Sequence, residues 1–220
     1  MDKLKHTREC DFMHTLNKWI GDFSWSGDAT TGSYALLKLH GFMDLISHSK
    51  KVAEIAEILG EAYGLEPKLQ AQCAALHNIS HIIPTEEKLE VARLLGIPLL
   101  LEEEENPILS GQKLSVVMAN KLFGIKNPQV LNAIGCHSTL KQSPSIFDMV
   151  FFISDKIVDL SDCNHELSLK IQDAMRVSLN KACLIYISAM LGDDKLLSPH
   201  PWLIAAYRCL HKRVKLENNE

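Results

Sequence analysis

Apolar residues recur at intervals of three and four positions along most of the chain, which is the period of a helix with one buried face. Two clear examples are the sets Val52, Ile55, Ala56, Leu59 and Leu114, Val117, Met118, Leu122. The β-branched stretches, such as MVFFIS at residues 149–154, are short and lie between helical patterns. No convincing run alternates apolar and polar residues as a half-buried strand does. The pattern therefore predicts an all-α protein.

Turn-forming residues, mainly glycine and proline, interrupt this pattern at several places. The breaks fall at residues 64–67, 84, 96–98, 106–107, 124–128, 142–145, 192–194 and 198–201. About eight helices fit between them, joined by loops of ordinary length. Residues 1–32 differ, because DFSWSGDATTG at 22–32 is rich in glycine, serine, threonine and aromatic residues. We therefore expect an N-terminal extension at 1–32, packed on or loosely tethered to a helical domain at 33–215. Trp19 and Trp25 in the extension are candidates for a homodimer contact or for covering the core.

Composition narrows the function classes. The 220 residues are 46% hydrophobic, which fits a folded protein with a sizeable core, and their formal net charge is -4. This charge, with no long basic stretch, argues against nucleic acid as a partner. The start, MDKLKHTREC, is charged, and no window approaches the roughly 18 apolar residues of a membrane span. We expect a soluble, cytoplasmic protein without a membrane partner. Six cysteines without any C-x-x-C pair are expected to be small core residues.

Four ionisable residues lie where the helical pattern turns side chains inward. They are His48, His77, His137 and Asp155, and the last of these interrupts the most apolar stretch of the chain. A single histidine on an apolar face is more often a hydrogen-bonded core residue than a ligand. Burying three imidazoles and a carboxylate without partners is costly, however, and a shared divalent metal would satisfy all four. The pattern therefore indicates a metal site.

The order and spacing of these residues resemble the HD-domain metal-dependent phosphohydrolases. Within them, the chain is most similar to the bacterial symmetrical bis(5'-nucleosyl)-tetraphosphatases, the YqeK family. The stretches that carry the resemblance are HSKKVAEIAEILGEAYGL (48–65), AQCAALHNIS (71–80), residues 106–139, FFISDKIVDL (151–160) and SLNKACLIYISAML (178–191). It implies an all-helical HD fold, a pair of iron-like metals, and hydrolysis of diadenosine tetraphosphate to two ADP.

The resemblance also implies a ligand set, with two substitutions. The positions that match ligands of the family are His48, His77, Asn78, His137 and Asp155. Asn78 stands where the family has an aspartate, and Gly111 where it has a further histidine. A neutral amide offers one carbonyl oxygen and cannot bridge two cations as a carboxylate does. We therefore expect fewer than two ions of Fe, Mn or Zn, or none.

Two functions remain open from the sequence. The first is a phosphoanhydride hydrolase with a nucleotide or small phosphorylated ligand as substrate, in which Asp155 and Lys156 are catalytic and His137 and Lys141 contact the substrate. The second is a catalytically inactive HD-fold module that binds a nucleotide or another protein. The surviving histidines and Asp155 favour the first, and the changes at Asn78 and Gly111 favour the second.

Two further groups have simpler interpretations. His81 follows His77 by four residues and would share its helix face if the helix persisted, so the pair could hold a cation. HNISH also mimics the zinc-protease motif H-E-x-x-H, but Asn78 replaces the general base and Pro84 follows closely. We expect His81 to be a solvated helix end. We expect LEEEEN at residues 101–106 to be a solvated acidic turn that caps the next helix, rather than a source of metal ligands.

Overall fold

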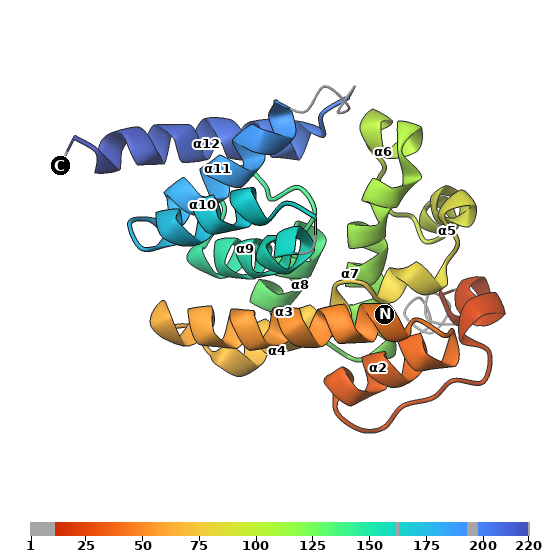
Figure 1. Cartoon of the computed structure of the whole chain (residues 1–220). Helices are drawn as coiled ribbons and strands as arrows, with labels where there is room; N and C mark the ends of the chain where they lie inside the picture. The colour runs from red at the N-terminus through yellow and green to blue at the C-terminus, as the bar shows by residue number, and fades with distance from the viewer. Residues whose placement is uncertain (1–11, 162, 193–197, 220) are drawn as a thin grey trace.

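A computed structural model describes residues 12–161, 163–192 and 198–219 (Figure 1). These residues form α-helices and short 3-10 helices, and no strand occurs among them, which confirms the predicted all-α fold. None of the described helices combines the length and the apolar character needed to cross a bilayer. After a helical segment at residues 12–20, the α-helices are α2 (Ala29–Leu39), α3 (Met43–Ala62), α4 (Pro67–Leu76), α5 (Lys88–Leu94), α6 (Leu101–Glu105), α7 (Gly111–Leu122), α8 (Pro128–Gly135), α9 (Ile146–Ser161), α10 (His165–Met175), α11 (Leu179–Leu191) and α12 (Pro201–Glu217).

The helices outnumber the roughly eight expected because the segment between α4 and α7 is divided finely. It contains the 3-10 helices η1 (Ile79–Ile82), η2 (Thr85–Glu87) and η3 (Pro107–Ser110) beside α5 and α6. Prolines and a glycine with positive φ, Gly96, interrupt this segment every few residues. Elements of three to seven residues are too short to show a hydrophobic period, so the sequence pattern could not separate them.

The described part of the N-terminal segment packs on the helical body. Phe12, Leu16 and Ile20 are buried in the same apolar cluster as residues of α2, α3, α4 and α7. The backbone then turns into α2, where the Asp28 carboxylate accepts hydrogen bonds from two N–H groups of the first turn. Trp25 covers that turn, and its indole N–H donates to the carbonyl of Asp28 at 2.7 Å. The domain boundary at residue 32 stays a prediction.

Helix α9 is the centre of the fold. It lies between α3 and α8 on one side and α10 and α11 on the other (Figure 1). Thirteen of its sixteen residues are buried. Phe147 and Phe151 belong to the apolar cluster of the N-terminal helices, whereas Phe152 and Ile153 belong to the cluster formed with α10, α11 and α12. Each fully buried phenylalanine contributes about 1.5–3 kcal/mol relative to an exposed one, so α9 is held firmly from both sides.

The described cysteines divide into two groups. Cys73, Cys136 and Cys183 are buried and unpaired, as predicted for small core residues. Cys163 is exposed and Cys209 is half-buried, so these two do not belong to the core. Cys10 lies outside the described residues.

The acidic segment at residues 101–106 is not simply a solvated turn, which corrects the expectation from the sequence. Glu103 is 0% exposed, and its Oε2 accepts hydrogen bonds from Lys113 Nζ at 2.6 Å and from the N–H of Leu100 at 2.8 Å. His200, at the start of α12, places its Nε2 3.6 Å from Oε1. Burial alone would raise the pKa of Glu103, but His200 and Lys113 lower it. Glu103 therefore links α6 to α7 and α12.

We expect Glu103→Gln to lower the free energy of unfolding by about 2–3 kcal/mol, because Lys113 would lose its carboxylate in a largely buried position. The pKa of Glu103 is lower in the folded state, so its contribution is present above its ordinary value near 4.5 and is lost as pH falls below it. Urea unfolding at pH 7 and pH 4 measures both effects. Glu104→Gln is the control, because Glu104 forms an exposed pair with Arg93 that is worth less than about 1 kcal/mol. Equal losses in the two variants would contradict the assignment.

Candidate metal site

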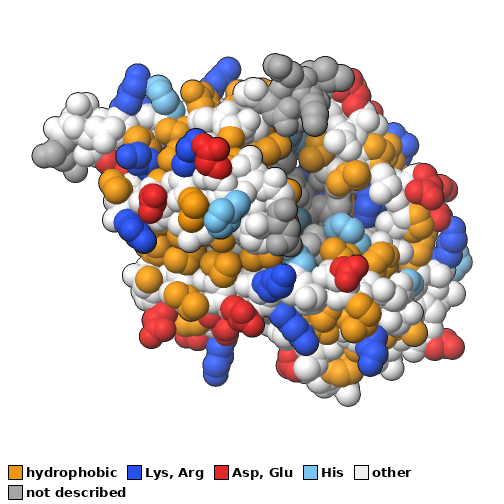
Figure 2. Space-filling model, viewed as in Figure 1, with side chains coloured by type: hydrophobic (Ala, Val, Ile, Leu, Met, Phe, Trp, Pro, Cys, Tyr) orange, Lys and Arg blue, Asp and Glu red, His pale blue; other side chains and the backbone are white. Residues whose placement is uncertain are grey.

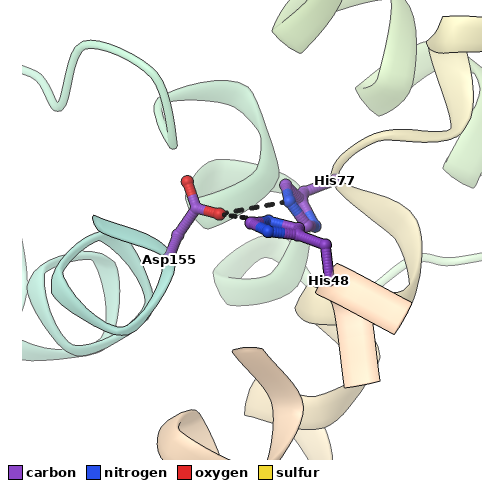
Figure 3. Close-up of side chains that lie close together, drawn as sticks. All are labelled: His48, His77 and Asp155. Carbon is purple, nitrogen blue, oxygen red and sulfur yellow. Dashed lines mark hydrogen bonds and ion pairs between the residues drawn. The ribbon is translucent and has the colours of Figure 1, made fainter. Parts of the chain in front are cut away.

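Three potential metal ligands converge from three helices (Figure 3). His48 lies in the first half of α3, His77 is the C-cap residue of α4, and Asp155 lies in the middle of α9. Asp155 Oδ1 is 3.0 Å from His48 Nε2 and 3.3 Å from His77 Nε2. One ligand atom from each residue lies within 4.8 Å of the other two. Residues separated by up to 107 positions therefore meet at one point, as a metal site requires.

A hydrogen bond behind the site fixes the tautomer of His77. Its Nδ1–H donates to the carbonyl of Ala74 at 2.8 Å, so a neutral ring presents the lone pair of Nε2 to the pocket. That lone pair faces the Asp155 Oδ1 atom, which is also an acceptor. A cation placed between these two acceptors would be bound by both of them. A backbone carbonyl behind a ligand histidine is the usual support of a metal site, so this donor set fits a divalent ion.

Charge at the site is balanced by a lysine on the far side of the carboxylate. Asp155 is 2% exposed, and its Oδ2 accepts a hydrogen bond from Lys156 Nζ at 2.6 Å. Burial alone would raise the pKa of Asp155, but the Lys156 ammonium and the hydrogen bond from His48 hold it well below its usual value. The hydrogen bond to Asp155 raises the pKa of His48. Lys156 also bonds to Asp159 at 3.0 Å, so acids accept two of the three N–H donors of its ammonium, and the lysine positions Asp155.

Two of the other expected ligands line the same pocket but lie outside the group of three. The ring of His137 packs edge-on against that of His77, with centroids 4.9 Å apart, and burial lowers its pKa to about 3. Its Nδ1–H donates to the carbonyl of Ile134, so Nε2 is an acceptor, which lies 3.2 Å from the Ser138 hydroxyl group. Nε2 could bind a cation, but it cannot donate to a phosphate oxygen. Asn78 places its side-chain Nδ2 2.7 Å from His77 Nε2, where it donates to the lone pair that a metal would use.

The structure does not bring Lys141 or His81 into this group. Lys141 Nζ is 2.9 Å from Asp148 Oδ2, and its side chain lines a different pocket, near Trp202. Helix α4 ends at Leu76 and η1 follows, so His81 does not continue the helix face of His77. The exposed His81 ring instead donates from Nδ1 to the carbonyl of Asn78 at 3.0 Å, as expected for a helix end.

The candidate ligands open onto a pocket of about 730 Å³. Figure 2 shows a hollow in the middle of the viewed face of the molecule, with histidine side chains around it. The pocket also contains a residue that the sequence pattern did not single out, Lys88 of α5. Lys88 is 3% exposed, its Nζ donates to the carbonyl of Ser80 at 2.6 Å, and burial lowers its pKa to about 8. A lysine side chain can bury its aliphatic part while its ammonium stays in water, so sequence periodicity does not predict whether such a residue is buried.

Comparison with known proteins identifies the family. The sequence profile of the HD domain matches residues 45–162, which is more than half of the chain and includes His48, His77 and Asp155. The chain belongs to the HD-domain family, in agreement with the broader part of the resemblance noted in its sequence. HD domains are generally metal-dependent, which agrees with the donor set described above.

The chain is also similar to two individual proteins. An uncharacterized protein encoded in the pepC 5' region of Lactococcus lactis subsp. cremoris is 37% identical over 148 residues, which cover 67% of this chain and 75% of that protein. Among solved structures, a predicted HD superfamily hydrolase involved in NAD metabolism from Clostridium acetobutylicum superposes with a TM-score of 0.73. It is 25% identical, and the match covers 87% of this chain and all of the other.

Proposed function

We propose that this protein is a metal-dependent phosphohydrolase that acts on a nucleotide or another small phosphorylated compound. The observation that carries the proposal is the convergence of His48, His77 and Asp155 on one point at the wall of a large pocket. Membership of the HD-domain family supports it, as does the likeness to a protein described as an HD superfamily hydrolase. These three residues would hold a divalent ion, which would supply Lewis acidity to activate water and to take up charge developing on phosphoryl oxygens.

The residues around the three ligands have distinct roles in this proposal. Asp155 supplies the negative charge of the site and directs Oδ1 toward both histidines, while Lys156 holds the other oxygen. His77 presents the lone pair of its Nε2, and His48 Nε2 would do so after losing the proton that it donates to Asp155. His137 stays neutral at physiological pH, so its Nε2 can accept a hydrogen bond from a hydroxyl group, as it does from Ser138, but its pKa of about 3 makes it too weak a base to remove the proton.

The pocket is large enough for a nucleotide-like substrate. Its volume of about 730 Å³ lies within the range typical of sites for small molecules and cofactors. The similar clostridial protein is described as involved in NAD metabolism, and nicotinamide dinucleotides contain phosphoanhydride bonds. Diadenosine tetraphosphate, which the sequence resemblance suggests, contains bonds of the same type. We propose that a phosphoanhydride bond of this kind is the bond that is hydrolysed.

A direct assay tests the proposal. The protein is supplied with Mn²⁺ or Fe²⁺ under anaerobic conditions and incubated with diadenosine tetraphosphate, NAD⁺, ADP-ribose and ADP, and products are separated by chromatography. We expect metal-dependent release of a nucleotide or of phosphate from at least one compound, and loss of that release with a chelator. No turnover of any compound by protein that carries the metal would contradict the proposal.

One observation favours a second candidate, a nucleotide-binding module without catalysis. Asn78 donates to His77 Nε2 and so satisfies without a metal the lone pair that a metal would bind. Calorimetric titration with ADP separates the two functions. Binding of the nucleotide without turnover, by a protein that retains no metal, would support the inactive module.

A further inference from the structure

We infer that Lys88 forms an anion subsite in this pocket and binds a phosphoryl oxygen of the ligand. The inference rests on the proposed function, because it places the phosphate group of the substrate within the pocket that the metal ligands line. No ligand role for Lys88 follows from the sequence pattern, and its assignment depends on three features of the structure.

The first feature is a missing counter-charge. Four lysines in the described part of the chain are not exposed, namely Lys88, Lys113, Lys141 and Lys156. Each of the last three has its Nζ within 3 Å of a carboxylate oxygen. Lys88 is buried and forms no ion pair with any described residue, and its one hydrogen bond is to the carbonyl of Ser80. A buried ammonium without an anion is costly, so an anionic ligand would complete this site.

The second feature is unused hydrogen-bonding capacity. An ammonium has three N–H donors, and the Ser80 carbonyl accepts only one of them. Lys88 nevertheless lines the pocket, together with the three candidate metal ligands. It approaches from α5, whereas His48, His77 and Asp155 come from α3, α4 and α9. Phosphate, with several anionic oxygens, can contact a cation from more than one side of a pocket at the same time.

The third feature is the space beside the ammonium. Gly111 begins α7, and a Cβ atom at that position would lie 3.2 Å from Ser80 Oγ and 3.9 Å from Lys88 Nζ. The φ angle of Gly111 is -56°, so the backbone there does not require glycine. The absence of a side chain therefore keeps the region next to Lys88 Nζ clear.

Calorimetric titration with inorganic phosphate and with pyrophosphate tests the inference, on metal-free protein and on protein loaded with Mn²⁺. We expect Lys88→Met to weaken binding of both probes at least about tenfold, as expected for loss of a charge-assisted hydrogen bond. Lys88→Arg keeps the charge and should stay within about threefold of the wild type. Lys121→Met is the matched control, because Lys121 is an exposed lysine of α7, and it should change nothing. Unchanged phosphate affinity in Lys88→Met would overturn the inference.

A second variant keeps the test decisive if Lys88→Met fails to fold. Gly111→Val leaves Lys88 in the chain and fills the space next to its ammonium. We expect at least about tenfold weaker phosphate binding with the Mn²⁺ content unchanged, and unaltered phosphate binding would overturn the inference. The outcomes also separate this inference from the proposed function. If phosphate binding depends on Lys88 but no compound is turned over, only the proposed hydrolase is contradicted. If a compound is turned over and neither substitution changes phosphate binding, only the anion subsite is contradicted.

Discussion

Asp155→Asn is expected to reduce the metal content of the purified protein to below about a tenth of an equivalent and to lower hydrolysis by at least about 10³-fold. Asp155 is the only carboxylate among the three converging ligands, and its Oδ1 is the atom that both histidines approach. The amide has nearly the same shape but no charge, so it binds a divalent cation far more weakly. Elemental analysis and turnover, measured on the same sample, check both effects.

The control for this experiment is an exposed acid of the neighbouring helix α10. Asp173 pairs with Arg176 at 3.5 Å, and it is neither one of the three converging ligands nor part of the pocket lining. Asp173→Asn should therefore retain metal and activity. Circular dichroism shows whether each variant is folded. Equal metal content in Asp155→Asn and the wild type would rule out the proposed site.

Asn78→Asp is expected to increase the affinity for Mn²⁺ by about 10- to 100-fold, in the range by which supporting groups change metal sites. In the wild type, the Asn78 amide donates to His77 Nε2 and occupies the lone pair that a metal needs. A carboxylate cannot donate at that place, and it adds negative charge beside the site. Without metal, the new carboxylate would face Asp155 across His77, so the variant should melt at a lower temperature when metal-free and at a higher one when loaded.

Adding the second substitution suggested by the sequence, Gly111→His, should not by itself create a two-metal site. The new side chain would begin 3.9 Å from the Lys88 ammonium, which repels a second cation there. We expect Asn78→Asp with Gly111→His to approach two equivalents of metal only when Lys88→Met is also present. Calorimetric stoichiometry with Mn²⁺ measures this. Two tightly bound ions in the wild-type protein would contradict our interpretation of Asn78 and Gly111.

The helical fold and the inward placement of the candidate ligands could be predicted from the sequence. His48 and Asp155 keep the spacing of their long apolar helices, α3 and α9, and such helices give a strong periodic signal. Their proximity in space could not come from periodicity, which describes one helix at a time. It was implied by the family resemblance, and the structure brings His48, His77 and Asp155 together. The metal and the reaction stay predictions.

The remaining residues depend on contacts that a local pattern does not contain. Glu103 is surrounded by exposed acids in the sequence, and its burial follows from Lys113, ten residues away, and from His200. His81 does not share a helix face with His77, which was the alternative to a solvated helix end, because the chain changes from α-helix to 3-10 helix after Leu76. Lys88 is buried by tertiary packing between short elements whose positions no periodicity reveals.

The central position of α9 has a consequence for the order of events during synthesis of the chain. His48 and His77 are translated early, but the ligand set needs Asp155, which follows His77 by 78 residues (155 - 77). At about 5–20 residues per second, the ribosome takes roughly 4–16 s to add them. Until then, the nascent N-terminal helices lack the helix that separates and covers both apolar clusters. A nascent chain should therefore acquire a metal ion only after α9 has been synthesised. Uptake of the ion would then report that α9 has packed against α3 and α4.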